Sequence, residues 1–369
     1  MGRYNPGAMT HVFVSPHPDD AALSCGGLIA SLRELGQNVA IVTVFSGNGS
    51  AEHFTPYQRE ALGFGSKALW PVTEAFNRAN IPNDVGASDE LLPPWAATAE
   101  RLDATQADAD AAAKRFWQRS SWYRRASIHN ESLAGQPVID QMPTQGAVLT
   151  VELTEAEAAA DATATRRLED ERYAYFAEAS LIVLDLPDAA FRGYEGDAEL
   201  LGTPRDDDPA PVALLRAEIA RLEPQKVYFP LGVGGHVDHQ LVRNVGLAMI
   251  GDARRWVMPG PEWAGIVSFY EDFPYAWWND FRSIDQLRES QANGFGELPY
   301  DVTIVPEYAD ISDQLERKIN GLTIYESQLP RLFGDTRQMA DAVRGYGRKI
   351  GALGGLNGHA ERYWSSLSL

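Results

Sequence analysis

The chain is poor in cysteine and in basic residues. Cys25 is the single cysteine among 369 residues, which excludes an intramolecular disulfide. Lysine and arginine number 32 against 51 acidic residues, and the formal net charge of -19 argues against binding to a nucleic-acid backbone, which requires basic patches. A local pocket can differ from this global charge, so a phosphorylated sugar stays compatible with it.

Signals for export and for membrane insertion are missing as well. No charged, apolar, small-residue signal peptide opens the sequence, and no apolar run approaches the ~20 residues that are needed to span a bilayer. We therefore expect a cytoplasmic protein without a membrane span. Cys25 falls in a predicted helix, where we expect a small buried residue rather than a nucleophile.

Apolar runs alternate with helical patterns over most of the chain, and the hydrophobic content of 44% is that of a globular protein with a large core. Two apolar strands that flank one helix favour a right-handed parallel crossover. We predict an α/β fold, Rossmann-like, with three layers (α/β/α) and a mostly parallel sheet. The expected strands are 11–15, 38–45, 181–184, 226–230, 267–269 and 302–305, and the expected helices are 20–35, 154–179, 211–222 and most of 311–350.

Residues 50–155 interrupt this alternation directly after the second predicted strand. The segment holds four tryptophans, which makes it too aromatic for a disordered linker. We interpret it as an ordered insertion in a single catalytic domain that spans 1–369. Its position near the expected site predicts a lid or wall of the substrate pocket, and a contact between subunits of a homo-oligomer is the alternative.

Three of the seven histidines lie in two short segments bounded by glycine or proline. The first is His17-Pro18-Asp19-Asp20, after the first predicted strand, and the second is Gly234-Gly235-His236-Val237-Asp238-His239, after the strand 226–230. Each segment spaces two polar groups three residues apart, so that one turn can direct both to one point. Because the carboxyl ends of parallel strands share one edge of a sheet, we expect the segments to meet. A helix cap with an incidental histidine is the alternative for the first segment alone.

These motifs resemble those of the PIG-L/LmbE-like zinc-dependent de-N-acetylases. The first motif of that family is usually Ala-His-Pro-Asp-Asp-Glu, and here Ala21 stands in place of the glutamate, which weakens a subfamily assignment more than the chemistry. The second motif, His-x-Asp-His, is intact. The resemblance covers residues 11–48 and about 160–345, but not 50–155. Weaker echoes lie at Arg167 with Asp170-Glu171, Leu186-Pro187-Asp188, Tyr270-Glu271-Asp272-Phe273-Pro274-Tyr275 and Tyr325-Glu326-Ser327-Gln328.

The side chains of the two motifs suit a hydrolytic metal site. His17, Asp20 and His239 supply two nitrogens and one carboxylate oxygen, a set that suits Zn2+ and leaves a position open for water. Fe2+ or another divalent metal fits the same donors, because imidazole and carboxylate do not select one metal. Asp19, next to a ligand, is the candidate general base.

The second motif also supplies a candidate for charge stabilisation. A protonated His236, which Asp238 would orient or charge, would stabilise a tetrahedral oxyanion and protonate the leaving amine. The resemblance implies the same roles, and it implies substrate contacts for Arg167 and Asp188, with a surface ion pair and a loop cap as the alternatives. Tyr270 and Asp272 are further candidates for the pocket wall.

Three functions from different classes follow from these observations. Members of the family deacetylate N-acetylglucosamine conjugates, so the resemblance implies a metal-dependent hydrolase that removes an acetyl group from an N-acetylated amino sugar or sugar conjugate. An amidase for a thiol conjugate or a natural-product amide, or a metal phosphoesterase, is the second reading. The third is a non-catalytic sugar-binding protein on the same fold.

Overall fold

A computed structural model describes residues 8–47, 69–70, 149–150, 155–194, 197–255, 265–278 and 302–368. Contacts within the chain divide it into two compact units, Met1–Gly49 with Arg166–Leu369, and Ser50–Thr165. Helix α7 (Glu155–Phe176) crosses the division. The second unit includes the antiparallel pair of β3 (Leu69–Trp70) and β4 (Leu149–Thr150). The predicted lid or subunit contact within 50–155, and the predicted helix start at Thr154, lie outside the described residues.

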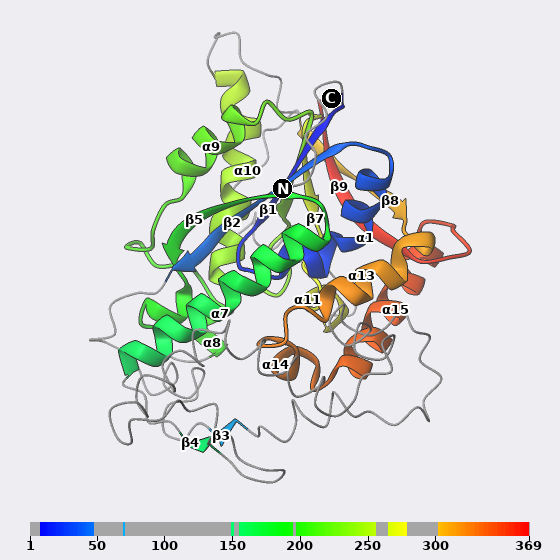
Figure 1. Ribbon diagram of the computed structural model, residues 1–369. Coiled ribbons are helices and arrows are strands. Elements are labelled where there is room, and N and C mark those ends of the chain that lie inside the picture. The colour runs from blue at the N-terminus through cyan, green and yellow to red at the C-terminus, as the bar shows by residue number, and fades with distance from the viewer. Residues whose placement is uncertain are drawn as a thin grey trace, which may run out of the picture. The chain divides into compact units, whose positions relative to one another are not determined.

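A seven-stranded sheet in the order β5-β2-β1-β6-β7-β9-β8 forms the centre of the first unit (Figure 1). Its first five strands in this order are mutually parallel. This arrangement confirms the predicted, mostly parallel sheet. The parallel strands are β1 (Thr10–Ser15), β2 (Asn38–Gly47), β5 (Ser180–Pro187), β6 (Lys226–Pro230) and β7 (Val267–Tyr270).

Two antiparallel strands complete the sheet. Strand β9 (Ala360–Ser368) lies between β7 and β8 (Val302–Asp310) and pairs antiparallel with both. Strand β9 is absent from the expected strands, because the segment Ala-Glu-Arg-Tyr-Trp-Ser-Ser-Leu-Ser lacks a continuous apolar run. Its polar residues are buried all the same, and the hydroxyls of Ser268 and Ser365 lie 2.9 Å apart between β7 and β9.

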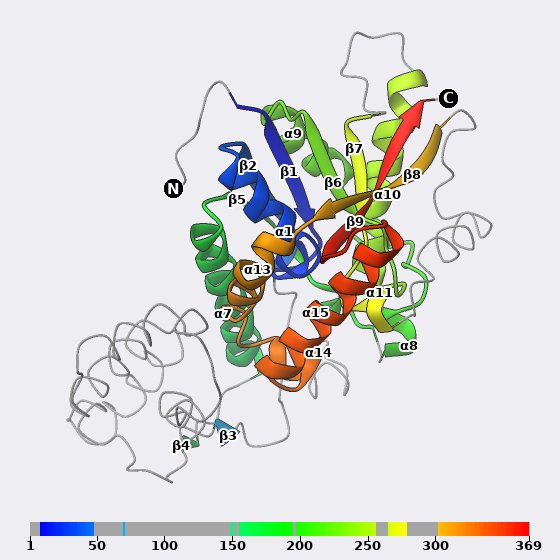
Figure 2. The same ribbon diagram turned by 90° about the vertical axis from the view of Figure 1, so that its right-hand side faces the viewer.

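Helices cover both faces of this sheet, which confirms the three-layer α/β/α prediction (Figure 2). Helices α1 (Asp20–Glu34), α13 (Leu315–Leu322) and α15 (Thr336–Leu353) cover one face. Helices α9 (Val212–Arg221) and α10 (Val237–Arg255) cover the other. No helix in the described part of the chain is long and apolar enough to cross a membrane. The shorter helices are η3 (Ala189–Phe191), α8 (Asp197–Leu200), α11 (Tyr275–Trp278), η4 (Ser312–Gln314) and α14 (Leu329–Phe333).

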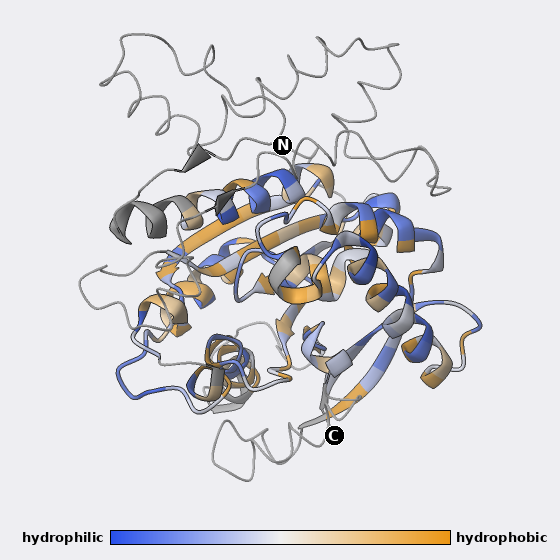
Figure 3. Cartoon of the chain, turned by 90° about the horizontal axis from the view of Figure 1, so that it is seen from below, coloured by the Kyte–Doolittle hydropathy of each residue, from blue (hydrophilic) through white to orange (hydrophobic). Residues whose placement is uncertain are grey.

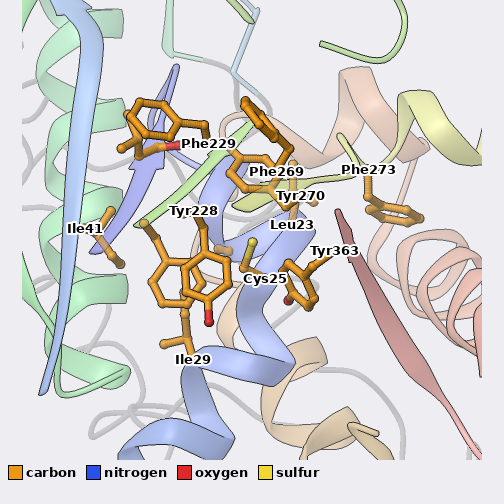
Figure 4. Close-up of a cluster of buried hydrophobic side chains, with 14 of the residues drawn as sticks. Leu23, Cys25, Ile29, Ile41, Tyr228, Phe229, Phe269, Tyr270, Phe273 and Tyr363 are labelled. Atoms are coloured by element: carbon orange, nitrogen blue, oxygen red, sulfur yellow. Dashed lines mark hydrogen bonds between the residues drawn. The ribbon is translucent and has the colours of Figure 1, made fainter. Parts of the chain in front are cut away.

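The core lies between the sheet and its helices. Hydrophobic residues follow the central strands, whereas hydrophilic residues mark the outer helix surfaces (Figure 3). Ile29 and Cys25 of α1 are fully buried in a cluster that includes Tyr228 and Tyr363 (Figure 4). Cys25 is thus a buried core residue, as predicted. Burial of an isoleucine side chain such as Ile29 contributes roughly 1.5–3 kcal/mol.

Helix α1 packs closely because two glycines occupy its middle. A Cβ atom at Gly27 would lie 2.6 Å from Cγ2 of Ile311, and one at Gly26 would lie 3.1 Å from Cγ of Lys318. The absence of a side chain at these two positions therefore allows the close packing of α1. Glu361 of β9 accepts hydrogen bonds from the backbone N–H groups of Gly27 and Leu28, each at 2.9 Å, and thereby anchors α1 to the sheet.

The strand order creates a switch point between β1 and β6. From β1 the chain continues to β2 and β5 on one side, whereas β6 is followed by β7 on the other side. Loops at such a point diverge and leave a crevice at the carboxyl edge, where open α/β sheets bind their ligands. The first motif follows β1 and the second follows β6, so both segments lie at this edge.

Candidate metal centre and active site

The loop after β1 positions the first motif through local hydrogen bonds. The backbone N–H of His17 donates to Oδ2 of Asp20 over 2.8 Å, and Asp20 is the first residue of α1. Asp19 precedes the helix with φ at 119°. A non-glycine residue in such a conformation costs about 1–3 kcal/mol, and strain of this kind concentrates at functional sites. Asp19 occupies the N-cap position of α1, but its side chain makes no capping hydrogen bond, so the alternative of a side-chain helix cap is not seen at this residue.

His17, Asp20 and His239 converge as the sequence predicts. Oδ2 of Asp20 lies 3.2 Å from Nδ1 of His17 and 3.2 Å from Nε2 of His239. Two donors on one tetrahedral zinc at ~2.0–2.1 Å are about 3.3 Å apart, so these spacings fit a metal of that size. All three side chains are buried, and His239 lies in the first turn of α10.

Each of these histidines is held by a second carboxylate on the ring nitrogen that does not contact Asp20. Nε2 of His17 lies 2.9 Å from Oδ2 of Asp238, and Nδ1 of His239 lies 2.6 Å from Oδ1 of Asp272. A carboxylate behind a metal-binding histidine fixes its tautomer and ring orientation. The structure contains this arrangement twice around Asp20.

The three residues stabilise one another's charged forms. Burial alone would lower the pKa of His17, but Asp188, Asp20 and Asp238 raise it to about 9. Burial alone would also lower the pKa of His239, but Asp20 and Asp272 raise it well above its usual value. The two histidines in turn hold the pKa of Asp20 well below its usual range, against the effect of burial. A metal at this site would displace the two ring protons, as metal binding by histidine requires.

Two different sets of three donors have all of their ligand atoms close to one another. Ligand atoms of His17, His236 and His239 lie within 4.8 Å of one another, and so do those of His17, Asp188 and Asp238. In the latter set Arg166 lies 2.9 Å from Asp188, and Arg192 lies 2.7 Å from Asp238. These two cations already neutralise the carboxylates, which makes this second set less suited to a metal.

Asp19 lies beside this centre with its carboxylate buried. No other side chain or N–H group in the described part of the chain donates a hydrogen bond to it. Burial, and after it the charge of Asp20, raise the pKa of Asp19 well above its usual value. A carboxylate with a raised pKa, next to the position of a reacting water, has the properties of a general base.

His236 lies among groups that oppose the expected protonated form. Desolvation by the surrounding protein, together with the charges of His17 and His239, lowers its pKa to about 3, so the ring is neutral. Asp238 contacts this ring through its backbone, because its N–H donates to Nδ1 of His236 over 3.3 Å. The Asp238 carboxylate faces His17 and does not orient His236. With Nδ1 as the acceptor of this bond, a neutral His236 carries its proton on Nε2, as a hydrogen-bond donor.

Arg166, rather than the expected Arg167, lies beside the site. The Arg167 guanidinium bonds to the carbonyl of Ser46 over 3.1 Å and pairs with Asp185, an exposed carboxylate. Arg166 pairs with Asp188 over 2.9 Å. Burial alone would lower the pKa of Arg166, but Asp188, Asp19 and Asp20 raise it. Both arginines lie on α7, where neighbouring residues point in directions about 100° apart, so the helical periodicity of this segment was the signal that could have distinguished Arg166 from Arg167.

Asp188 lies at the site but is bound by the protein. Its Oδ1 accepts the N–H of Ala190 over 2.9 Å and caps η3, and its Oδ2 pairs with Arg166. The expected alternative of a loop cap is thus present. A direct contact of Asp188 with a substrate remains a prediction.

Tyr270 and Asp272 lie behind the site and not on a pocket wall. Tyr270 is fully buried, and its hydroxyl donates to the carbonyl of Val14 over 2.8 Å. Asp272 is also buried, with Oδ1 on His239 and Oδ2 accepting the N–H of Val233 over 2.8 Å. The pairing of Asp272 with His239 makes it a positioning residue for the candidate metal ligand.

Two carboxylates of α7 form a further buried network. Asp170 accepts hydrogen bonds from Thr43 over 2.6 Å and from Tyr325 over 2.9 Å. Glu169 accepts bonds from the N–H and the hydroxyl of Ser327. Burial raises the pKa of Glu169 to about 7 and that of Asp170 to about 6. This network joins α7 to the turn before α14.

Comparisons with known proteins agree with the motifs and the fold. Residues 12–68 match the PIG-L model, described as GlcNAc-PI de-N-acetylase. The chain is 30% identical over 215 residues to 2'-N-acetylparomamine deacetylase of Streptomyces fradiae. The aligned residues cover 54% of this chain and 69% of that relative.

Solved structures share the fold at low sequence identity. The A40926 pseudoaglycone deacetylase has a TM-score of 0.52 at 18% identity and covers 97% of both chains. A deacetylase of the teicoplanin pathway, solved with teicoplanin, has a TM-score of 0.53 at 17% identity and covers 98% of this chain and 99% of its own. The sequence identity to the Streptomyces fradiae deacetylase and the match to the family model show that this chain belongs to the PIG-L/LmbE-like family of de-N-acetylases.

Proposed function

We propose that the protein is a metal-dependent deacetylase that hydrolyses the acetamide of an N-acetylated amino sugar or sugar conjugate. One observation carries this proposal. Two histidines, each backed by its own buried carboxylate, converge on a single oxygen of Asp20 at 3.2 Å. Such pairs of histidine and carboxylate are typical of metal ligands.

His17, Asp20 and His239 would hold the metal, for which Zn2+ is the first candidate and Fe2+ or another divalent ion fits the same donors. A bound metal of this kind activates water at neutral pH and polarises a carbonyl. Two nitrogens and one carboxylate oxygen leave a coordination position open for water or substrate, as a hydrolytic site requires.

The remaining side chains supply proton transfer and charge stabilisation. Asp19 accepts the proton of the attacking water, because its carboxylate is adjacent to Asp20 and no other described residue donates a hydrogen bond to it. The neutral His236 donates from Nε2 to the developing oxyanion of the acetamide. Arg166, fixed by Asp188, adds a partly buried positive charge beside this position.

The substrate class follows from the relative with the higher identity. That protein is named as a deacetylase of 2'-N-acetylparomamine, an N-acetylated amino sugar conjugate. An N-acetylated hexosamine within a larger glycoside is therefore our first choice of substrate for this chain. A natural-product amide or a thiol conjugate is the second.

The experiment is a screen of purified protein, loaded with one equivalent of Zn2+ or of Fe2+. Release of free amine and of acetate is measured from N-acetylglucosamine, N-acetylated glycosides including 2'-N-acetylparomamine, and non-sugar acetamides. We expect amine and acetate in equal amounts from at least one N-acetyl sugar, and none from the His239→Ala variant.

Other outcomes separate the alternatives. Turnover of non-sugar acetamides alone would indicate the amidase. Saturable binding of sugars without any release of acetate, by protein with full metal occupancy, would contradict the proposal and indicate a sugar-binding protein.

A further inference from the structure

Arg192 lies between Asp208 and Asp238, and Asp238 in turn contacts His17. It follows η3 directly, and its side chain is only 9% exposed. Its guanidinium makes three separate contacts. Nε donates to Oδ1 of Asp208 over 2.9 Å, and Nη1 donates to the carbonyl of Pro187 over 2.9 Å. Nη2 forms an ion pair with Oδ1 of Asp238 over 2.7 Å, without the geometry of a hydrogen bond.

The outer end of this chain is also fixed. Oδ2 of Asp208 accepts the backbone N–H of Arg205 over 2.8 Å and the hydroxyl of Tyr194. The Arg205 guanidinium lies 4.2 Å from the centre of the Tyr194 ring. Arg192 itself lies 5.2 Å from the ring centre of Phe45. Contacts other than that with Asp238 thus fix the position of the Arg192 guanidinium.

The inner end determines how Asp238 faces His17. Oδ2 of Asp238 lies 2.9 Å from Nε2 of His17 and accepts the N–H of Ala189 over 3.0 Å, while Oδ1 meets Arg192. A rotation of this carboxylate would break the contacts of both oxygens at once. Asp238 is fully buried, so water cannot replace a lost partner.

We infer that Arg192 is a positioning residue of the metal centre: it fixes the carboxylate of Asp238, which in turn holds His17 in the tautomer that leaves Nδ1 free for the metal. The inference rests on the proposed metal site formed by His17, Asp20 and His239. Partners behind a metal ligand typically contribute 10–100-fold in metal affinity. Arg192 acts through one intervening residue, so we expect a loss of about tenfold on its removal.

The planar fork of arginine is essential to this role. Two hydrogen-bond acceptors hold Nε and Nη1 of the guanidinium, which places Nη2 beside Oδ1 of Asp238, and lysine presents a point charge that cannot make both hydrogen bonds and this ion pair with comparable geometry. Arg192→Lys keeps the charge but loses the fork. We therefore expect this variant to bind metal more weakly than the parent and more tightly than Arg192→Ala.

The test measures Zn2+ affinity by competition with a chromogenic chelator, for the parent, Arg192→Ala, Arg192→Lys and Asp238→Asn. Arg33→Ala is the matched control, because Arg33 has the same side-chain exposure of 9% and pairs with Glu178 near the other end of α1. Thermal unfolding without metal is recorded for each variant. We expect about tenfold weaker binding for Arg192→Ala, parent-like binding for Arg33→Ala, and no further loss when Arg192→Ala is added to Asp238→Asn.

Several results would overturn the inference. Metal affinity of Arg192→Ala within twofold of the parent, with unfolding temperature lowered or not, would reduce Arg192 to a structural residue. Additive losses in the double variant would show that Arg192 does not act through Asp238. If Arg192→Ala does not fold, Arg192→Lys and Asp208→Asn decide the question by the same twofold limit. A parent protein that binds neither Zn2+ nor Fe2+ would instead contradict the proposed function itself.

Discussion

Replacement of Asp272 by asparagine tests whether the buried carboxylates support the metal centre. Asp272 is 1% exposed, and its two oxygens accept from Nδ1 of His239 at 2.6 Å and from the N–H of Val233 at 2.8 Å. Asparagine has a single side-chain oxygen, so either Nδ1–H of His239 or the N–H of Val233 must face the amide NH2 group, which cannot accept a hydrogen bond. A buried donor without an acceptor costs about 1–3 kcal/mol.

The carboxylate also makes His239 a better ligand, and its loss typically lowers metal affinity 10–100-fold, which is about 1.4–2.8 kcal/mol. We expect Asp272→Asn to bind Zn2+ at least tenfold more weakly than the parent in chelator competition. Urea unfolding in the presence of a chelator measures the separate loss of stability. Asp335→Asn, at the exposed cap of α15, serves as the control with unchanged affinity. Parent-like metal affinity in a folded Asp272→Asn protein would refute the reasoning.

Three further predictions address the base, the ligand set and the buried acids. His239→Ala should lose the metal, because two remaining ligands rarely hold zinc against a chelator, and full occupancy by elemental analysis would remove His239 from the site. Asp19→Asn should keep the metal and lower turnover by about a hundredfold or more; turnover at the parent rate would show that another group is the base. Burial raises the pKa of Glu169 from 4.5 to about 7, so the folded state keeps a proton that the unfolded state loses, and stability falls as pH rises through this interval. Glu169→Gln should flatten this fall, measured by urea unfolding from pH 4.5 to pH 7, and an unchanged pH slope would contradict the assigned pKa.

Most of the parallel sheet was predictable because its strands are continuous apolar runs. Strands β1 and β2, and helix α1 between them, begin and end within a few residues of the expected bounds. β9 was not predictable in this way. Its serines and charged residues are buried by pairing with other polar groups, which a hydropathy pattern does not reveal.

The candidate ligands were predictable from motif spacing and strand position, since both motifs follow parallel strands at one edge. The supporting residues were not. Asp272 and Arg192 act from separate loops, and their contacts with His239 and Asp238 depend on tertiary structure alone. The choice between Arg166 and Arg167 depends on a rotation of one residue about the axis of α7, which the motif did not specify.

The anchoring of α1 by Glu361 links the candidate metal centre to a distant part of the chain. The bonds from Gly27 and Leu28 to this carboxylate span 334 and 333 residues. Contacts of such long range form slowly, since loop closure precedes any gain in energy. The amide protons of Gly27 and Leu28 should therefore exchange with solvent deuterium at the rate at which β9 detaches from the sheet. Hydrogen exchange at two positions of α1 would thus report how often the helix that begins at Asp20 is released.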